Sequence, residues 1–223
     1  MTPLTMSDFA GTNTPIQPRR APRRESAVLP QVRVGAKVRP LPHQAFAFAV
    51  VTADDSVVEL QLGNSGPLAL NLTVHSHHLV DLKPERHDLM PGQAFAVEIP
   101  TSGGVYDIAV HGPDNFLRTV AGDMASTLAG FEASLSITGP ASSPGLLLAL
   151  RNVDRVTREF KVTNRIGSSA SHRIAPGNSH EVRLQPLQHD DGWYDFTVTV
   201  EGVSSFSRRF SGHLTNGLPQ DPS

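Results

Sequence analysis

The chain has 223 residues and no cysteine, and 39% of its residues are hydrophobic while 18% are charged. This composition is typical of a soluble globular protein, and it excludes a disulfide framework, a thiolate nucleophile and a cysteine-based zinc site. No apolar run approaches the roughly 20 residues that a membrane-spanning helix needs, and the N-terminus lacks the basic-then-apolar pattern of a signal peptide.

Residues 1–38 are predicted to be an extended linker. Seven prolines lie within residues 1–42, and this spacing favours an extended strap. Seven basic residues face only two acidic ones up to residue 39, whereas the remaining chain has 12 basic and 19 acidic residues, a net charge of −7. The overall charge of −2 therefore hides a basic segment in front of an acidic body.

Four arginines of the linker are candidates for contact with a lipid surface: Arg19, Arg20, Arg23 and Arg24. Clustered cations gain electrostatic free energy near anionic phosphates. We favour a solvated linker whose arginines hydrogen-bond to an adjoining domain, because the prolines keep them off a single helical face. No aromatic residue lies between them, so no nucleic acid partner is expected.

Residues 39–124 are predicted to form a first β-sandwich. Apolar residues alternate or run together over 44–51, 57–62, 70–75 and 94–99, and 104–122 is typical of a β-hairpin. Short strands with turn signals about every eight to twelve residues favour an antiparallel sandwich over alternating strands and helices.

Residues 130–216 repeat this pattern and are predicted to form a second β-sandwich. Leu60-Gln-Leu-Gly-Asn64 matches Leu148-Ala-Leu-Arg-Asn152 at an offset of 88, and Tyr106 matches Tyr194 at the same offset. Such self-similarity indicates a duplicated unit. We therefore expect an all-β chain of two tandem antiparallel sandwiches, joined by a link short enough for them to touch, with a tail over 217–223.

Each copy ends in a hairpin that brings an acid and a base onto neighbouring strands. A two-residue turn at 201–202 predicts that Asp195 lies opposite Arg208, and a four-residue loop at 111–114 predicts that Asp107 lies opposite Arg118. We interpret both as structural ion pairs. A catalytic carboxylate is disfavoured, since an adjacent arginine lowers an Asp pKa and leaves a weak base.

The predicted Asp195–Arg208 pair does not fit the alternation of the second hairpin cleanly. In a regular strand Arg208 shares one face with Phe206 and Phe210. Either that face is partly buried, or a bulge redirects one of the residues.

The aromatic residues of the hairpins have structural interpretations. Tyr106 and Tyr194 begin the penultimate strands, where sandwiches often place a tyrosine whose hydroxyl bonds to the backbone at the strand corner, and we prefer this role to ligand contact. Trp193 is the only tryptophan and lies on the opposite parity. We favour its packing in a small cluster, with a surface contact at the rim as the alternative.

The histidines do not form a recognisable metal site. His75 and His77 would face the same way on a strand, as a ligand pair requires, but no third ligand follows at a recognisable spacing. The chain also lacks a nucleophile elbow, a Walker loop, a dinucleotide-binding glycine pattern and a His-Glu-x-x-His motif. We predict no catalytic, cofactor-binding or metal-binding residue.

Several stretches carry a family resemblance: Arg39-Pro-Leu-Pro42 opens the first copy, and Trp193-Tyr-Asp-Phe-Thr-Val-Thr-Val200 and Arg208-Arg-Phe-Ser-Gly-His213 close the second. The doubled pattern resembles the C-terminal domain pair of bacterial phosphocholine-preferring phospholipases C. In that family the pair follows a catalytic domain related to acid phosphatases, which holds the metal ligands and the nucleophile. Thr2-Pro-Leu-Thr-Met-Ser-Asp-Phe-Ala10 looks like the segment that leaves the catalytic domain, and no residue here matches the family's catalytic ones.

The resemblance implies a non-catalytic accessory module of an enzyme that cleaves phosphatidylcholine or sphingomyelin in lipid catabolism. Its partners would be the catalytic phospholipase domain, in cis or in trans, and a phospholipid surface. The location would be that of the parent enzyme, extracellular or periplasmic. The alternatives are a lipid-surface binder and a free-standing adhesion or carbohydrate-binding module, for which one tryptophan and two tyrosines offer little aromatic surface.

Overall fold

The computed structural model describes residues 44–51, 56–79, 81–124, 131–140 and 142–215. The predicted linker, the link between the copies and the tail lie outside these residues. Residues 44–124 are called the first half below, and residues 131–215 the second half.

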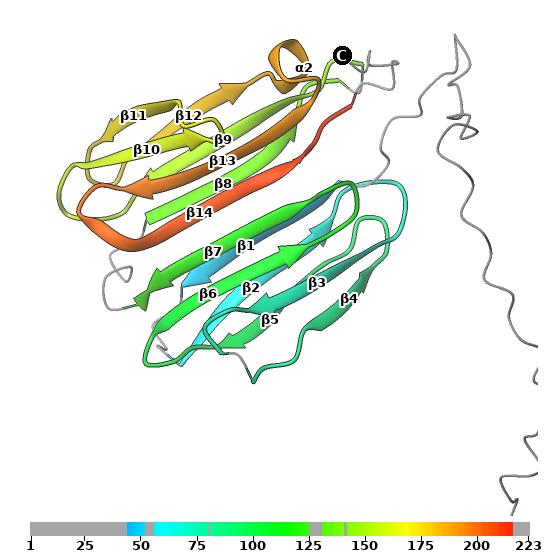
Figure 1. Ribbon diagram of the computed structural model, residues 1–223, viewed down its shortest axis with the longest axis horizontal. Coiled ribbons are helices and arrows are strands. Elements are labelled where there is room, and N and C mark those ends of the chain that lie inside the picture. Colours follow the sequence, from blue (N-terminus) through cyan, green and yellow to red (C-terminus); the bar gives the residue numbers. More distant parts are fainter. Residues whose placement is uncertain (1–43, 52–55, 80, 125–130, 141, 216–223) are drawn as a thin grey trace, which may run out of the picture. The chain divides into compact units, whose positions relative to one another are not determined.

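Both halves consist almost wholly of β-strands (Figure 1). The strands of the first half are β1 (Ala45–Val51), β2 (Val57–Asn64), β3 (Leu70–Ser76), β4 (Glu85–Leu89), β5 (Ala94–Pro100), β6 (Val105–His111) and β7 (Leu117–Asp123). The second half contains β8 (Phe131–Thr138), β9 (Gly145–Asn152), β10 (Arg158–Asn164), β11 (Ser169–Ile174), β12 (Ser179–Leu184), β13 (Trp193–Val200) and β14 (Val203–His213), and the short helix α2 (Pro186–His189).

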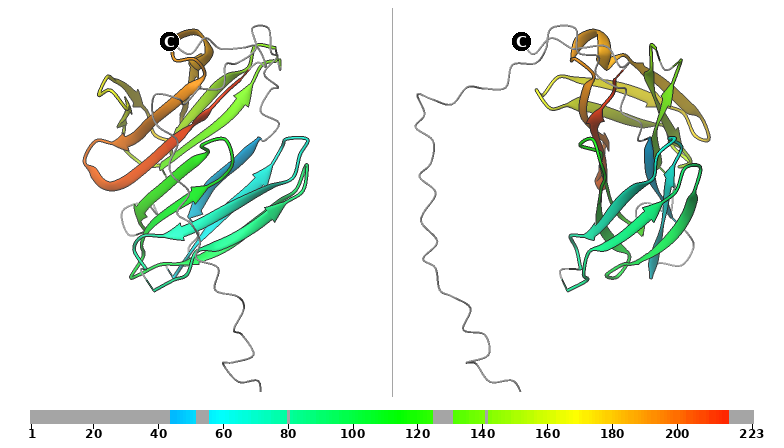
Figure 2. Two further views of the ribbon diagram at one scale, coloured as in Figure 1. Left: turned by 45° about the vertical axis from the view of Figure 1, so that its right-hand side comes forward. Right: turned by 90° about the vertical axis from the view of Figure 1, so that its right-hand side faces the viewer.

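The described strands form three antiparallel sheets. Each half has a three-stranded sheet, in the order β1-β2-β5 or β12-β9-β8. The other strands of both halves join in one eight-stranded sheet, in the order β11-β10-β13-β14-β7-β6-β3-β4. In each half the small sheet faces part of the large one (Figure 2). The predicted all-β antiparallel sandwich fold is confirmed.

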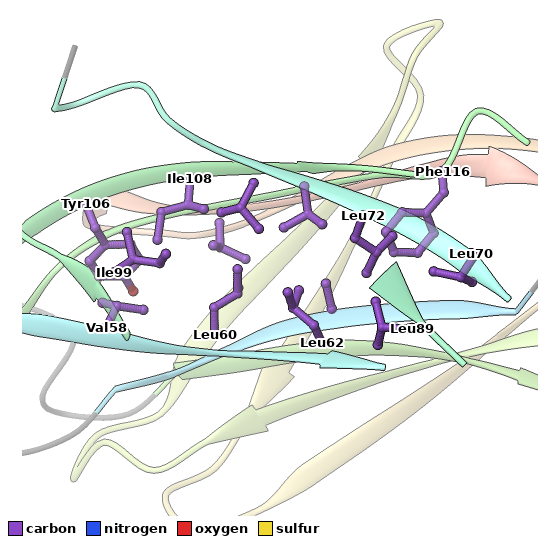
Figure 3. Close-up of a cluster of buried hydrophobic side chains, with 14 of the residues drawn as sticks. Val58, Leu60, Leu62, Leu70, Leu72, Leu89, Ile99, Tyr106, Ile108 and Phe116 are labelled. Atoms are coloured by element: carbon purple, nitrogen blue, oxygen red, sulfur yellow. The ribbon is translucent and has the colours of Figure 1, made fainter. Parts of the chain in front are cut away.

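The core of the first half lies between its two sheets (Figure 3). Val58, Leu60 and Leu62 point inward from β2 and are fully buried, whereas Glu59 and Gln61 between them point outward. This period of two follows from the pleat of a strand. Burial of each such side chain stabilises the fold by about 1.5–3 kcal/mol.

The core of the second half contains a cluster of aromatic rings. Phe131, Phe160 and Phe206 meet edge to face, with centroids 5.7–6.5 Å apart. Aromatic rings prefer this arrangement because the positive edge of one ring meets the negative face of another.

Two strands that the sequence did not predict occupy the edges of the large sheet. They are β4 and β11, and each buries only its last residue, Leu89 or Ile174. Edge strands need few apolar residues, and polar side chains there discourage pairing with other chains. The alternation that reveals an inner strand is therefore missing.

Candidate functional site

The two halves meet along a seam, which we define as the pairing of β7 with β14. The two strands lie side by side (Figure 1) and are antiparallel. Val120 lies opposite Arg208, and Arg118 lies opposite Phe210. They are the last strands of their halves, so the duplicated units join through equivalent elements. The predicted contact between the two sandwiches takes the form of one continuous sheet.

Two buried arginines bridge the seam in a reciprocal arrangement. Arg118 and Arg208 are only 5% and 4% exposed. Arg208 donates from Nη2 to Tyr106 Oη at 3.0 Å, and Arg118 donates from Nη2 to Tyr194 Oη at 3.1 Å. Each arginine of one half therefore binds the tyrosine of the other.

The Nη1 groups of these arginines donate to backbone oxygens on both sides of the seam. Arg118 Nη1 donates to the carbonyl groups of Leu117 and Ser211, each at 2.9 Å. Arg208 Nη1 donates to those of Ala121 at 2.5 Å and Ser207 at 2.9 Å. A buried charge is tolerated only when hydrogen bonds replace its lost water.

Glycines make room for this network. Gly122 lies opposite Tyr106, and Gly212 lies opposite Tyr194. A Cβ atom at Gly122 would lie 2.3 Å from Tyr106 Oη, and one at Gly212 would lie 2.5 Å from Tyr194 Oη. A side chain at either glycine would displace the hydroxyl that accepts the arginine bond. The expected hydroxyl bond to the backbone at the strand corner is not what the structure shows, because each hydroxyl accepts a bond from an arginine of the other half.

The predicted partners of the two aspartates are incorrect. Asp195 lies opposite Ser211, and Arg208 lies opposite Val198. In the first half Asp107 lies opposite Ala121, and Arg118 lies opposite Val110. Both registers differ from the prediction by three residues in the same direction.

The shift has a local cause in each hairpin. The predicted turn places Val200 opposite Val203, but the next pair is Thr199 with Ser207, so β14 bulges over residues 204–206. In the first half the loop runs from 112 to 116. An odd shift moves a side chain to the other face of the sheet, so the arginines point inward and the aspartates outward.

The aspartates find other partners on the outer face of the large sheet. Asp195 accepts two hydrogen bonds from Arg209, at 2.8 and 2.7 Å, and this carboxylate raises the pKa of Arg209. Asp107 lies 3.6 Å from His77 Nδ1, and both side chains are about half exposed. A bidentate arginine–carboxylate pair has a defined geometry, but partly exposed ion pairs contribute little to stability.

Trp193 lies at the surface, at the start of β13. Its side chain is 50% exposed, and its ring centroid lies 4.5 Å from that of His213. The favoured prediction of a packed cluster therefore holds only for one side of the ring. The four linker arginines, Arg19, Arg20, Arg23 and Arg24, lie outside the described residues.

Three histidines gather on the outer face of the first half. His75 and His111 contact edge to face with centroids 5.2 Å apart. Burial, and then the nearby His75 and His77, lower the pKa of His111. Among the described residues no group of three or more His, Asp or Glu side chains has the arrangement of a metal site.

Comparison with known proteins identifies the family. The family described as bacterial phospholipase C, C-terminal domain, matches residues 38–123 and again residues 132–213. The chain belongs to this family. The two matched segments carry equivalent seam residues, so the family domain is the duplicated unit.

Three curated relatives of this phospholipase C domain pair are themselves longer proteins. The chain is 28% identical over 207 residues to a non-hemolytic phospholipase C of Pseudomonas aeruginosa, covering 86% of the chain and 29% of the relative. A non-hemolytic phospholipase C of Burkholderia pseudomallei is 25% identical over 198 residues, covering 86% and 28%. A hemolytic phospholipase C of P. aeruginosa is 30% identical over 125 residues, covering 53% and 17%. The chain thus spans less than a third of the length of these relatives.

A buried asparagine staples each phospholipase C domain, and sequence reasoning missed its role. Asn64 Nδ2 donates to the carbonyls of Leu68 and Leu89, and Asn152 Nδ2 donates to those of Val156 and Ile174. Each Oδ1 accepts a backbone N–H two residues later. The signal in the sequence was the repeated motif that ends in Asn64 and Asn152. Asn64 holds the loop after β2 against β4, and Asn152 holds the loop after β9 against β11.

A second equivalent position carries a partly buried histidine in each half. His87 of β4 contacts Phe95 with centroids 5.5 Å apart, and His172 of β11 contacts His180 with centroids 4.7 Å apart. Burial, and then the neighbouring His180, lower the pKa of His172. The second half therefore has a pair of titratable rings where the first has one.

No helix among the described residues is long and apolar enough to cross a membrane.

Proposed function

We propose that this chain is a non-catalytic C-terminal accessory module of a bacterial phospholipase C that hydrolyses phosphatidylcholine or sphingomyelin in lipid catabolism. The observation that carries the proposal is the double family match, which covers both halves and leaves most of each relative's length outside the alignment. The partner is the catalytic phospholipase domain. The parent enzyme is proposed to act outside the cytoplasm, in the periplasm or the extracellular medium.

The seam supports a role as a rigid support. A flexible tandem would let each half move separately, whereas two antiparallel strands and two buried arginine–tyrosine bonds join these halves. Inter-domain motion is the usual expectation unless the interface is extensive and well packed. A catalytic domain attached to this module would rest on a single body.

We also propose that one end of the second half touches the lipid surface. Trp193 is 50% exposed and Ile166, at the tip between β10 and β11, is 82% exposed. The backbone N–H of Arg165 donates to the carbonyl of Asp195, so this tip lies beside the start of β13. An exposed tryptophan with an aliphatic and a basic neighbour suits the interfacial layer of a bilayer.

A chimeric enzyme tests the accessory role. This chain replaces the matched segment of the P. aeruginosa non-hemolytic phospholipase C, and the relative lacking that segment serves as the control. We expect no release of phosphocholine from phosphatidylcholine vesicles by the chain alone. The chimera should hydrolyse the vesicles and resist heat longer than the truncated control. Phosphocholine release by the isolated chain, or a chimera no better than the truncated control, would contradict the proposal.

Vesicle binding tests the lipid contact separately. Trp193→Ala with Ile166→Ser should weaken co-sedimentation of the chain with phosphatidylcholine vesicles. The matched change Val153→Ser with Val156→Ser, at another exposed apolar loop, should leave it unchanged. Equal losses in both variants would rule out a specific contact at the Trp193 end.

A further inference from the structure

The outer face of the small sheet differs between the two halves. In the first half Phe46, Phe48 and Val50 point outward from β1, since Ala45, Ala47 and Ala49 pack against the core. The two phenylalanine rings stack with centroids 6.2 Å apart, and Phe48 is 38% exposed. We call the outward residues of β1, β2 and β5 the apolar face.

Small residues extend this apolar face beyond β1. Phe46 lies opposite Gly63, and a Cβ atom at Gly63 would lie 1.9 Å from Phe46 Cζ, so the ring covers the glycine. Ala94 of β5 is paired with Gly63, and Ala96 is paired with Gln61. The face therefore has two aromatic rings along β1 and small residues beside Phe46, with the polar Gln61 between Phe48 and Ala96.

The equivalent face of the second half is polar along its edge strand β8, while its central strand β9 directs Leu147 and Ala149 outward. The strand β8 directs Glu132, Ser134 and Ser136 outward where β1 has Phe46, Phe48 and Val50. Glu132 lies opposite Arg151, and the two form an exposed ion pair at 3.7 Å. Phe46 over Gly63 in one half thus corresponds to an ion pair in the other.

The fold itself does not require the outward phenylalanines of β1, because the equivalent strand β8 has Glu132 and Ser134 in their place. A sheet face that contacts only solvent can carry charged side chains, as the second half does with Glu132 and Arg151. Clustered exposed apolar residues rimmed by polar ones mark contact surfaces. Glu59 of the central strand β2 lies between Val50 and Glu98, so acidic residues border the phenylalanines at one end of this face.

Two observations indicate which partner covers the apolar face. Gln44 leads directly into β1, so whatever precedes the module in the chain joins it at the strand that carries the two phenylalanines. The relatives match over their C-terminal part, so their remaining length precedes the module. None of the outward residues of β1, β2 and β5 is basic, and Glu59 and Glu98 disfavour phosphate groups of lipid.

We infer that the apolar face of the first half is the docking surface for the catalytic domain of the phospholipase, whereas the equivalent face of the second half stays in water. This inference rests on the proposed function and adds the location of the contact. Phe46 and Phe48 are the anchors, since buried aromatic residues contribute most to interfaces. Tethering through the residues that precede β1 raises the effective concentration of the partner near this face.

Hydroxyl-radical footprinting of the chimera described above tests the inference. Oxidation of Phe46 and Phe48 should fall by roughly fivefold from the free chain to the chimera, as expected for anchors that lose water on docking. A Ser134→Phe variant supplies a matched reporter on the equivalent face of the second half, and its new ring should be oxidised equally in both. Phe46→Glu with Phe48→Ser and Val50→Ser, the residues of the second half, should abolish the extra heat resistance of the chimera.

The outcomes separate this inference from the proposed function. An active, heat-resistant chimera in which both phenylalanines stay fully oxidised overturns the inference and leaves the proposed function standing. A chimera no better than the truncated control contradicts both. The free chain is also tested for self-association and for sedimentation with phosphatidylcholine vesicles. If either occurs and Phe48→Ser alone abolishes that binding, the apolar face has another partner and the inference is overturned. Phe48→Ser is the milder change, and its urea midpoint is measured alongside to check that the sheet remains folded.

Discussion

Removing one hydroxyl from the seam should destabilise the chain measurably. Tyr106→Phe keeps the ring over Gly122 but removes the acceptor of a buried arginine bond of 3.0 Å. Because a hydrogen bond to a charged group contributes about 1.5–3 kcal/mol, we expect a loss in that range. Tyr194→Phe is the matched change in the other half. Its bond to Arg118 is only partly buried, so water can replace the hydroxyl and the loss should be smaller, about 0.5–1.5 kcal/mol.

Urea unfolding of the two variants and the wild type measures these losses. With a slope of about 2–3 kcal/mol per molar urea, Tyr106→Phe should lower the midpoint by about 0.5–1.5 M. The slope itself should not change, since the fold is retained. A loss below about 0.5 kcal/mol for Tyr106→Phe, or a larger loss for Tyr194→Phe, would refute the reasoning that the buried arginine depends on this acceptor.

Three further changes test other parts of the structure. Asn152→Ala should cost about 2–4 kcal/mol in the same urea assay, because it leaves buried backbone groups unpaired; a loss below 1 kcal/mol, on the order of one exposed hydrogen bond, would contradict the staple. The lowered pKa of His172 means that its protonation favours the unfolded chain, so stability should fall as the pH decreases from the usual 6.5 through the lowered pKa. His180→Phe, which restores the ring pair of the first half, should reduce that fall in thermal midpoint, and an unchanged pH profile would contradict this. Asp195→Asn should cost under about 1 kcal/mol, and less in high salt, because the carboxylate's pair with Arg209 is partly exposed; a salt-independent loss would be contrary evidence.

The fold could be predicted because its signal is local. Residues such as Val58, Leu60 and Leu62 alternate with polar neighbours in a strand of eight residues, and the same pattern returns in the second copy. Alternation and repetition need no knowledge of distant contacts. The edge strands β4 and β11 were not predicted, because each buries a single side chain and so shows no alternation.

The register of the hairpins could not be predicted, because counting from a turn assumes a regular ladder. Three extra residues follow the turn in β14, and the loop of the first half extends to Phe116. Bulges depend on what the strand must pack against, so a sequence gives little notice of them. The odd shift then placed Asp195 and Arg208 on opposite faces.

The seam was hidden because it pairs strands about 90 residues apart and buries charges. Arginine is almost never fully buried unless it is paired, so Arg118 and Arg208 suggested ion pairs with the aspartates of their own hairpins. The clue was the repeated Phe-x-Arg, since Phe116 and Phe206 lie 4.3 and 4.4 Å from the guanidinium carbons of the arginines that follow them. The repeat showed that these residues matter in both copies, but only the fold shows that each serves the other half.

Calorimetry of the purified chain tests most directly the claim that the two halves act as one support. Because β7 and β14 share a sheet and each half supplies the hydrogen-bond acceptor of the other, we predict a single unfolding transition whose calorimetric and van't Hoff enthalpies agree. Two separate transitions, with Tyr106→Phe shifting only one of them, would contradict the account.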